Sequence, residues 1–284
     1  MRFGGSNAGV LAGWQGGVLA AVVMIACRSM HPDLQHQLES IDQRLRARYN
    51  IAADQTDVGL LDLRDPSRVA MIHPDHEEYA ASVAKVGILY AWFALGHDVD
   101  AATQHELGLM IKASSNEMAA KYSRIMGLAA IQQTLNAAGF YDASKGGGIW
   151  VGKHYGPGSE RIGDPVANHS HAVTVRQLLR FYAMLDRGEL VSPAASRTMK
   201  EIFLSPDIPQ DDHKFAKGLH GRDVAILRKS GTWEDWLHDS AIVEGPGRRY
   251  VLVGLTHNPR GDAYLEELAS DVDDLMRTSR SNNP

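Results

Sequence analysis

Apolar residues at regular spacing mark out the secondary structure in the first third of the chain. Residues 31–49 place leucine and isoleucine at intervals of three and four, which predicts an amphipathic helix. The β-rich runs 57–63 and 69–72 flank turn residues at 65–67 and predict two strands of a hairpin. A further helix is expected to begin near residue 82 and to run through an apolar stretch to residue 95.

The middle of the chain is rich in helical periodicity. Residues 101–111, 116–126, 129–138 and 174–187 all carry it. A glycine-rich, irregular run from 145 to 171 interrupts the series. Because loops of that length in compact domains usually carry function or move, this run is a candidate functional segment.

Three β-rich runs and a final helix close the chain. The runs are 224–227, 240–243 and 250–255, and the helix covers 263–276. Strands from both ends of the chain then have to meet in one sheet. The sequence therefore predicts an α+β fold with an antiparallel sheet of about five strands. The N- and C-terminal helices flank this sheet, and an all-helical lobe is inserted over about residues 86–215.

The first 27 residues differ from the rest of the chain. Arg2 precedes an uncharged stretch from 8 to 27 that is almost wholly apolar over 18–26, and this pattern predicts an export signal. The residues before Cys27 are similar to a bacterial lipobox, so Cys27 is the expected lipidation site and 28–284 the exported domain. A cleaved signal without lipid and an uncleaved membrane anchor are the alternatives. All three place the domain outside the cytoplasm, in the periplasm or the cell envelope.

Composition adds two exclusions. The chain has 44% hydrophobic and 22% charged residues, as an ordinary globular protein does. Its net charge of −5 argues against a nucleic-acid partner, because a phosphate backbone attracts a basic surface. Cys27 is the only cysteine, so no intrachain disulfide can form.

Ser82 and Lys85 form a Ser-x-x-Lys pair at the start of a predicted helix. Residues three apart share a helix face, so the lysine amine can reach the serine hydroxyl. A lysine whose pKa is lowered by burial can accept the hydroxyl proton and make the serine a nucleophile. Taken alone, the pair also fits a serine near a helix start and a solvated lysine.

Two further motifs follow along the chain. Ser-x-Asn at 114–116 precedes a predicted helix, where serine and asparagine are also ordinary N-caps. Lys-Ser-Gly-Thr at 229–232 follows the predicted strand 224–227, where a strand end with a glycine turn is the ordinary interpretation. Each motif is weak alone, so the signal lies in their order and their contexts.

The ordered set of motifs resembles the signature of the class A β-lactamase and penicillin-binding protein superfamily. The resemblance covers the chain from about residue 31 to the C-terminal helix. It implies the β-lactamase/transpeptidase-like fold and a serine hydrolase without cofactor or metal. The implied substrates are β-lactams or the D-Ala-D-Ala ends of cell-wall peptides.

The resemblance also implies roles for individual residues. Ser82 attacks the amide carbonyl, Lys85 takes its proton or tunes the base that does, and Ser114 passes a proton to the departing nitrogen. The oxyanion lies between the backbone N–H groups of Ser82 and Thr232, donors that contribute on the order of 3 kcal/mol each. The implied substrate-binding residues are Asn116, Lys229, Ser230, Gly231 and Thr232.

Release of the acyl group separates the candidate functions. Class A β-lactamases carry Glu-Pro-x-x-Asn after the second motif to activate the hydrolytic water, and this chain has Asp164 in the same frame. Asp164 is therefore the expected deacylating residue of a β-lactamase, although Asp-Pro is also a common turn. Glu160 is a second candidate. Without such an acid, the chain is a D,D-peptidase or a penicillin sensor that stays acylated.

The histidines and tryptophans leave other options open. The 13 histidines include His73-x-x-His76 and a pair at 169 and 171, but no His-Glu-x-x-His pattern, so no metal site is expected. Trp233 and Trp236 follow the third motif and are candidates for the cleft wall or for the core. The remaining expectations are a monomer and membrane attachment through the N-terminus.

Overall fold

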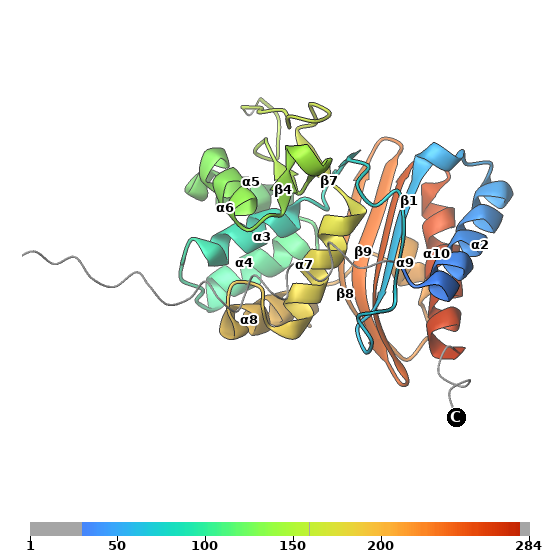
Figure 1. The fold of residues 1–284 in the computed structure, drawn as a ribbon. Coiled ribbons are helices and arrows are strands. Elements are labelled where there is room, and N and C mark those ends of the chain that lie inside the picture. The colour runs from blue at the N-terminus through green and yellow to red at the C-terminus, as the bar shows by residue number, and fades with distance from the viewer. Residues whose placement is uncertain (1–29, 159, 279–284) are drawn as a thin grey trace, which may run out of the picture.

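A five-stranded antiparallel sheet separates two layers of helices in the computed structural model, which describes residues 30–158 and 160–278 (Figure 1). The export signal predicted for residues 1–27, with Cys27, lies outside these ranges and stays a prediction. Within the described ranges, no helix combines the length and the apolar character that crossing a bilayer requires.

The sheet joins strands from both ends of the chain. Its order is β2-β1-β10-β9-β8, and every neighbouring pair is antiparallel. The pairing of β1 with β10 confirms that the N- and C-terminal strands share one sheet. The strands are β1 (Thr56–Asp62), β2 (Val69–Ile72), β8 (Ala225–Trp233), β9 (Trp236–Gly245) and β10 (Arg248–His257).

The terminal helices cover one face of the sheet. These are α2 (Pro32–Tyr49) and α10 (Gly261–Thr278), and the short α9 (Lys214–Gly218) packs beside α10 (Figure 1). Proline in the first turn suits the start of α2, and Asn50 ends it in the left-handed conformation.

The opposite face of the sheet carries the helical lobe, in which α7 (Val175–Arg187) packs against β1 and β10. A side-chain carbon at Gly59 of β1 would lie 2.5 Å from Val175 Cγ1, so glycine is what lets α7 approach the sheet. The other helices of the lobe are α3 (Lys85–Ala94), α4 (Ala101–Ile111), α5 (Asn116–Met126), α6 (Leu128–Ala137) and α8 (Pro193–Leu204).

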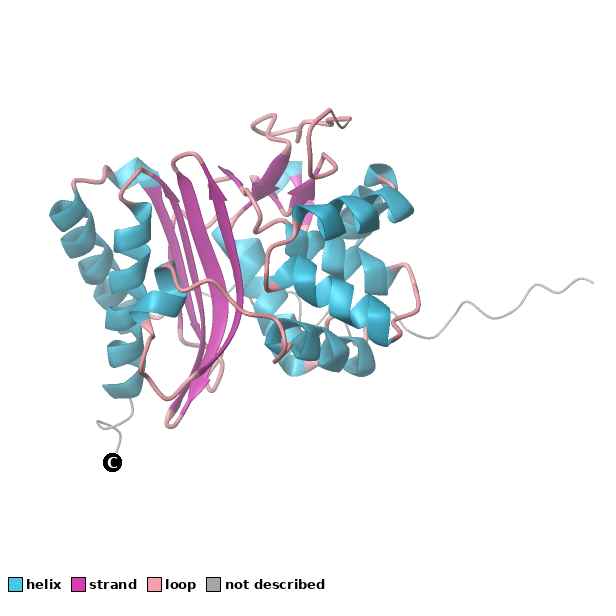
Figure 2. Cartoon of the chain, turned by 180° about the vertical axis from the view of Figure 1, so that it is seen from behind, coloured by secondary structure: helices cyan, strands magenta, loops and turns pink. Residues whose placement is uncertain are grey.

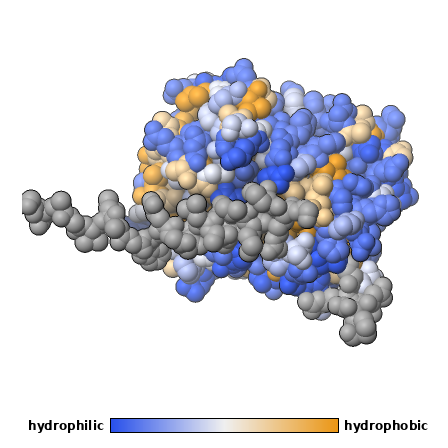
Figure 3. Space-filling view, in the orientation of Figure 1, coloured by the Kyte–Doolittle hydropathy of each residue, from blue (hydrophilic) through white to orange (hydrophobic). Residues whose placement is uncertain are grey.

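The strands contribute alternately to two apolar cores. Leu60 of β1 and Leu252 of β10 face the α2–α10 core, whereas Leu61 and Val253 face the core of the lobe. Because helices cover both faces (Figure 2), all seven residues of β1 are buried. The outer face in Figure 3 is mostly hydrophilic, as expected when the apolar faces of the layers pack against one another.

The structure departs from the sequence-based predictions in three places. Strand β8 continues to Trp233, so residues 229–232 lie inside a strand, because they pair with β9. Helix α8, which Ser192 caps, is absent from those predictions. The lobe is not all-helical, because short strands beside and within the glycine-rich run pair with one another and with a strand at 78–79 that precedes the lobe. They are β3 (Glu78–Tyr79), β4 (Tyr141–Asp142), β5 (Gly147–Gly148), β6 (Trp150–Val151) and β7 (His171–Val173).

Candidate active site

Ser82 lies in a tight turn immediately before α3. The helix itself begins at Lys85, because the preceding backbone bonds run from residue i+3 to residue i, as between Lys85 N and Ser82 O at 3.2 Å. Ala81 adopts a left-handed conformation with φ of 47°, and the Tyr155 hydroxyl donates a hydrogen bond to its carbonyl at 3.0 Å. This turn holds the Ser82 side chain half-buried at the edge of a pocket.

The Lys85 amine lies at the centre of the candidate site. Its Nζ is 3.0 Å from Ser82 Oγ, 2.7 Å from Asn116 Oδ1 and 2.6 Å from the Ser114 carbonyl oxygen. Burial lowers the pKa of Lys85 to about 7. A large share of these amines is therefore neutral near pH 7, which is the state that can accept a proton from a serine hydroxyl.

Ser114 joins this lysine to a second one. Its Oγ is 3.3 Å from Lys85 Nζ and 2.9 Å from Lys229 Nζ. Burial and the nearby Lys85 charge lower the pKa of Lys229 well below its ordinary value. The hydroxyl of Ser114 therefore lies where it can pass a proton between two amines.

Gly231 lets the turn of the nucleophile approach strand β8. A side-chain carbon at Gly231 would lie 2.9 Å from the Ala80 carbonyl oxygen and 3.1 Å from Ser82 N. This close approach requires glycine and brings the Ser82 turn against the strand that carries Thr232. Ser82 and Thr232 both line the same cavity of about 410 Å³.

Three of the sequence-predicted site residues, Ser82, Asn116 and Thr232, line that cavity together with several other residues. The aromatic and imidazole rings of its wall include Tyr155 and His171, which stack with their centroids 4.3 Å apart. Among the described residues, the lining contains no carboxylate. The lining residues are Tyr79, Ala81, Ser82, Asn116, Lys153, Tyr155, Gly156, Pro157, Ser170, His171, Thr232 and Trp233.

The two candidate tryptophans have different positions. Trp233 lines the cavity and leaves 55% of its surface exposed. Trp236 lies outside that lining, where it packs edge-on against Tyr79 and stacks on His257. Only Trp233 is therefore placed to contact a bound molecule.

A buried charge network supports β8 from behind. Arg228 Nε is 2.7 Å from Asp239, and its Nη1 is 2.7 Å from Asp211. The Arg228 side chain is 1% exposed and that of Asp239 is fully buried. Sequence reasoning missed this network because nothing in the local pattern pairs residues from β8, β9 and the loop before α9.

The network extends to the hydroxyls of the third motif. Ser230 Oγ donates to Asp211 at 3.2 Å, and Lys214 Nζ donates to Thr232 Oγ1 at 2.6 Å. Lys214 also donates to the Gly231 carbonyl at 2.8 Å. Each of these two hydroxyls, which the sequence predicts to bind substrate, thus has a charged partner that fixes its orientation. Asp211 and Lys214 come from a polar stretch that fits a solvated loop, so the sequence carried no signal for them.

The described contacts that join Ser82, Lys85 and Ser114 do not include Asp164, which also does not line the cavity. Its carboxylate accepts hydrogen bonds from the backbone N–H groups of Val166 and Ala167, both at 2.8 Å, and from that of His169. Burial and a hydrogen bond with Asp164 raise the pKa of Glu77 to about 8, so Glu77 is protonated at neutral pH. Asp164 therefore closes its own turn, as the Asp-Pro alternative predicted.

The neighbouring loop gives no replacement for this acid. Glu160 is exposed and is not among the residues that line the cavity. Arg161 instead anchors the loop, because its guanidinium contacts the side chain of Asn168 at 3.3 Å and also the Asn168 carbonyl. The Asp-Pro-x-x-Asn frame is thus a structural turn in this chain.

A family model and several solved structures match the chain. The model, described as the beta-lactamase enzyme family, matches residues 96–276. This range contains the second and third motifs but begins after Ser82 and Lys85, whose assignment therefore depends on geometry. No curated protein sequence matches the chain.

Three of the similar structures illustrate the likeness. A beta-lactamase from Sphaerobacter thermophilus has a TM-score of 0.67 at 12% identity and covers 85% of this chain and 97% of its own. An ancestral class A beta-lactamase has a TM-score of 0.62 at 20% identity, covering 85% and 99%. PBP-A has a TM-score of 0.59 at 17% identity, covering 83% and 95%. At these identities the matches confirm the predicted fold.

Proposed function

Because this chain belongs to the beta-lactamase enzyme family, we propose that it is a serine acyl hydrolase that opens β-lactam amides through an acyl-enzyme at Ser82. One observation carries the proposal. A buried lysine with a pKa of about 7 lies 3.0 Å from a serine hydroxyl that faces a cavity. This is the arrangement of a nucleophile and its general base.

Acylation begins with proton transfer from Ser82 Oγ to the neutral amine of Lys85. The oxygen attacks the carbonyl carbon of the amide, and a C–O bond forms as the carbonyl oxygen becomes an oxyanion. The backbone N–H groups of Ser82 and Thr232 are the proposed donors to that oxyanion. The Gly231 contact supports this role, because it brings the two segments close together.

Collapse of the tetrahedral intermediate breaks the C–N bond and leaves an amine that needs a proton. Ser114 supplies it, because its hydroxyl lies between the Lys85 and Lys229 amines. The proton that Lys85 took from Ser82 then replaces the one that Ser114 gave. Every proton transferred in acylation therefore comes from a residue of the site.

A substrate carboxylate would bind at the end of β8. Lys229 supplies positive charge there, and the hydroxyls of Ser230 and Thr232 supply hydrogen bonds. The contacts of these hydroxyls with Asp211 and Lys214 favour one orientation of each. This site suits an acyl-amide with a nearby carboxylate, as in a β-lactam.

We infer that the acyl-enzyme is released slowly. Asp164 uses its oxygens within its own turn, and the described lining of the cavity offers no carboxylate to activate water. Burial lowers the pKa of His171 to about 3, which makes this lining residue a weak base. Slow release is the property expected of the second candidate function, a D,D-peptidase. PBP-A, a mutant of which has been seen as an acyl-enzyme complex with penicillin G, shares this fold.

The proposal predicts a covalent adduct that persists. Incubation with benzylpenicillin should add one penicillin mass to the intact protein, and Ser82→Ala should add none. After excess drug is removed, the adduct should decay slowly. Asp164→Asn should leave the decay unchanged, because residue 164 does not line the cavity and the amide oxygen can still accept from Val166 and Ala167. Intact-mass spectrometry over time measures both steps.

Other outcomes of this experiment assign the function differently. Rapid decay that Asp164→Asn slows would support a β-lactamase that deacylates through Asp164. If the adduct persists as expected, a second assay divides the remaining candidates: release of D-alanine from a D-Ala-D-Ala peptide would support the peptidase, and no release would support a sensor. An equal mass increase in Ser82→Ala would exclude Ser82 as the nucleophile.

We also propose that the chain is exported and lipidated at Cys27. The apolar stretch over 18–26 and the lipobox-like residues before Cys27 support this proposal. The mature protein should begin at Cys27, carry a lipid mass and sediment with membranes, and Cys27→Ser should move it to the soluble fraction. A mature chain that is cleaved but carries no lipid would instead indicate an ordinary cleaved signal peptide. An uncleaved chain would indicate a membrane anchor.

A further inference from the structure

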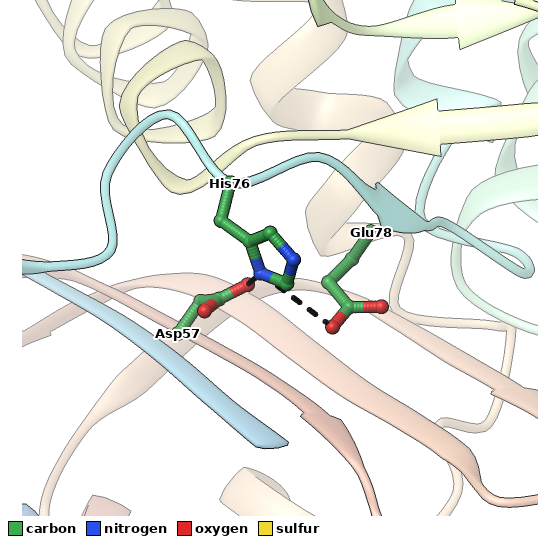
Figure 4. Close-up of side chains that lie close together, drawn as sticks. All are labelled: Asp57, His76 and Glu78. Atoms are coloured by element: carbon green, nitrogen blue, oxygen red, sulfur yellow. Dashed lines mark hydrogen bonds and ion pairs between the residues drawn. The ribbon is translucent and has the colours of Figure 1, made fainter. Parts of the chain in front are cut away.

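A second cluster of ionisable side chains lies outside the candidate active site. Asp57 from β1, His76 from the loop before β3 and Glu78 from β3 point toward one another (Figure 4). One potential ligand atom from each residue lies within 4.8 Å of the other two. The sequence shows the His73-x-x-His76 pair, but only the tertiary structure adds the two carboxylates.

The spacing of this cluster suits a shared metal ion. His76 Nδ1 is 2.9 Å from Asp57 Oδ2 and 3.8 Å from Glu78 Oε1. Two ligands about 2.1 Å from a tetrahedral zinc ion lie about 3.4 Å from each other. These two separations lie on either side of that value, and the Asp57 and Glu78 oxygens lie within 4.8 Å of each other, so side-chain movements would bring all three atoms into coordination.

The ion pairs of the cluster differ from those of most buried aspartates among the described residues. Four buried aspartates pair with arginine: Asp42, Asp62, Asp239 and Asp273. Asp57 is 1% exposed and Glu78 is 7% exposed. Among the described residues, their ion-pair partners are histidines alone. A divalent cation would add positive charge directly beside these two buried carboxylates.

The surroundings supply an entry path and a supporting contact. The side chains of His73 and His76 are 44% and 50% exposed, so an ion can reach the cluster from solvent. His73 Nδ1 lies 3.2 Å from the other carboxylate oxygen of Asp57 and 3.0 Å from the Thr56 carbonyl. A histidine that holds a ligating carboxylate in this way is a common outer contact of metal sites.

We propose that Asp57, His76 and Glu78 bind a structural zinc ion, with His73 orienting Asp57. One nitrogen and two oxygens are donors that zinc accepts, and water would complete its coordination. The ion would join β1 of the main sheet to β3, the strand that leads into the Ser82 turn. It would therefore stabilise the fold beside the active site without taking part in acylation.

Zinc titration of the untagged full chain tests this site. After treatment with a chelator, calorimetry should show one zinc equivalent bound by the wild type and by the control His220→Gln, which changes an exposed histidine elsewhere. Asp57→Asn and His76→Gln should lose this equivalent. His73→Gln should weaken binding by about 10- to 100-fold, as outer contacts of metal sites do.

Two further measurements distinguish zinc bound by Asp57, His76 and Glu78 from zinc bound by exposed histidines elsewhere. Zinc should raise the melting temperature of the wild type and of His220→Gln, because it binds the folded state, and should not raise that of His76→Gln. Bound cobalt(II) should show the visible absorption of an ion with a low coordination number, and His76→Gln should abolish this absorption. Circular dichroism and penicillin labelling of Ser82 establish that each variant is folded.

The proposal is overturned if the wild type, His76→Gln and His220→Gln bind zinc equally. It is also overturned if zinc leaves the melting temperature of the wild type unchanged, or if cobalt(II) stays fully hydrated. Failure of penicillin labelling with zinc binding intact would instead count against the proposed function alone.

Discussion

Replacing Lys85 by methionine is expected to slow the acylation of Ser82 by about 10²- to 10⁴-fold, the usual contribution of a positioned general base. Methionine keeps much of the length of the side chain in this fully buried position but has no amine to accept the proton. The rate of benzylpenicillin adduct formation, followed by intact mass, measures the effect.

The pH dependence of acylation tests the same residue. The base has to be the neutral amine, and this form grows as the pH rises through the lysine pKa of about 7. The wild-type rate should therefore rise by about tenfold per unit below pH 7 and level off above it. The Lys85→Met variant should lose this dependence.

A matched control distinguishes the loss of the general base from the loss of a lysine elsewhere in the protein. Lys121→Met removes an exposed amine whose partner is Glu106, on the surface of the lobe. It should keep the wild-type rate and pH profile. If Lys85→Met were acylated as fast as the wild type, another group would have to be the base.

Arg228 lies between Asp239 and Asp211, and its substitution is expected to have the second large effect, a loss of stability. Arg228→Met should lower the free energy of unfolding by about 3–5 kcal/mol, the usual cost of breaking a buried ion pair. The loss is this large because it leaves the fully buried Asp239 carboxylate without its cation. Urea denaturation followed by circular dichroism measures it.

The control for this prediction is an exposed arginine. Arg48 pairs with Glu267 on the surface, with side chains 57% and 32% exposed, so solvent replaces much of the interaction when it is lost. Arg48→Met should therefore change the stability much less than Arg228→Met. An equal decrease of the unfolding free energy in the two variants would show that burial does not make the Arg228 ion pairs more important for stability.

Most helices were predictable because their signals are local. The predicted ranges 101–111 and 116–126 coincide with α4 and α5, whose starts are capped by Asp100 and Ser115. The C-terminal strands are longer than the apolar runs that predicted them. The polar ends of β8 and β10 pair with β9, which lies between them. Such pairing depends on a neighbouring strand rather than on the residues themselves.

The sequence by itself determined the order of the main-sheet strands and of most helices, the antiparallel sheet and the family signature. These depend on periodicity and on short motifs, such as the three-residue spacing of Ser82 and Lys85, which local backbone geometry turns into a contact.

Only the tertiary structure decided which distant groups share a site. It supplied the contact between Ser114 and Lys229, 115 positions apart, which the family resemblance had implied. It also placed Asp211 and Lys214 behind the third motif and left Asp164 in its own turn. It also brought Asp57 and Glu78 to His76. Burial and strand pairing set such contacts, and both come from the packing of whole layers, so no local pattern records them.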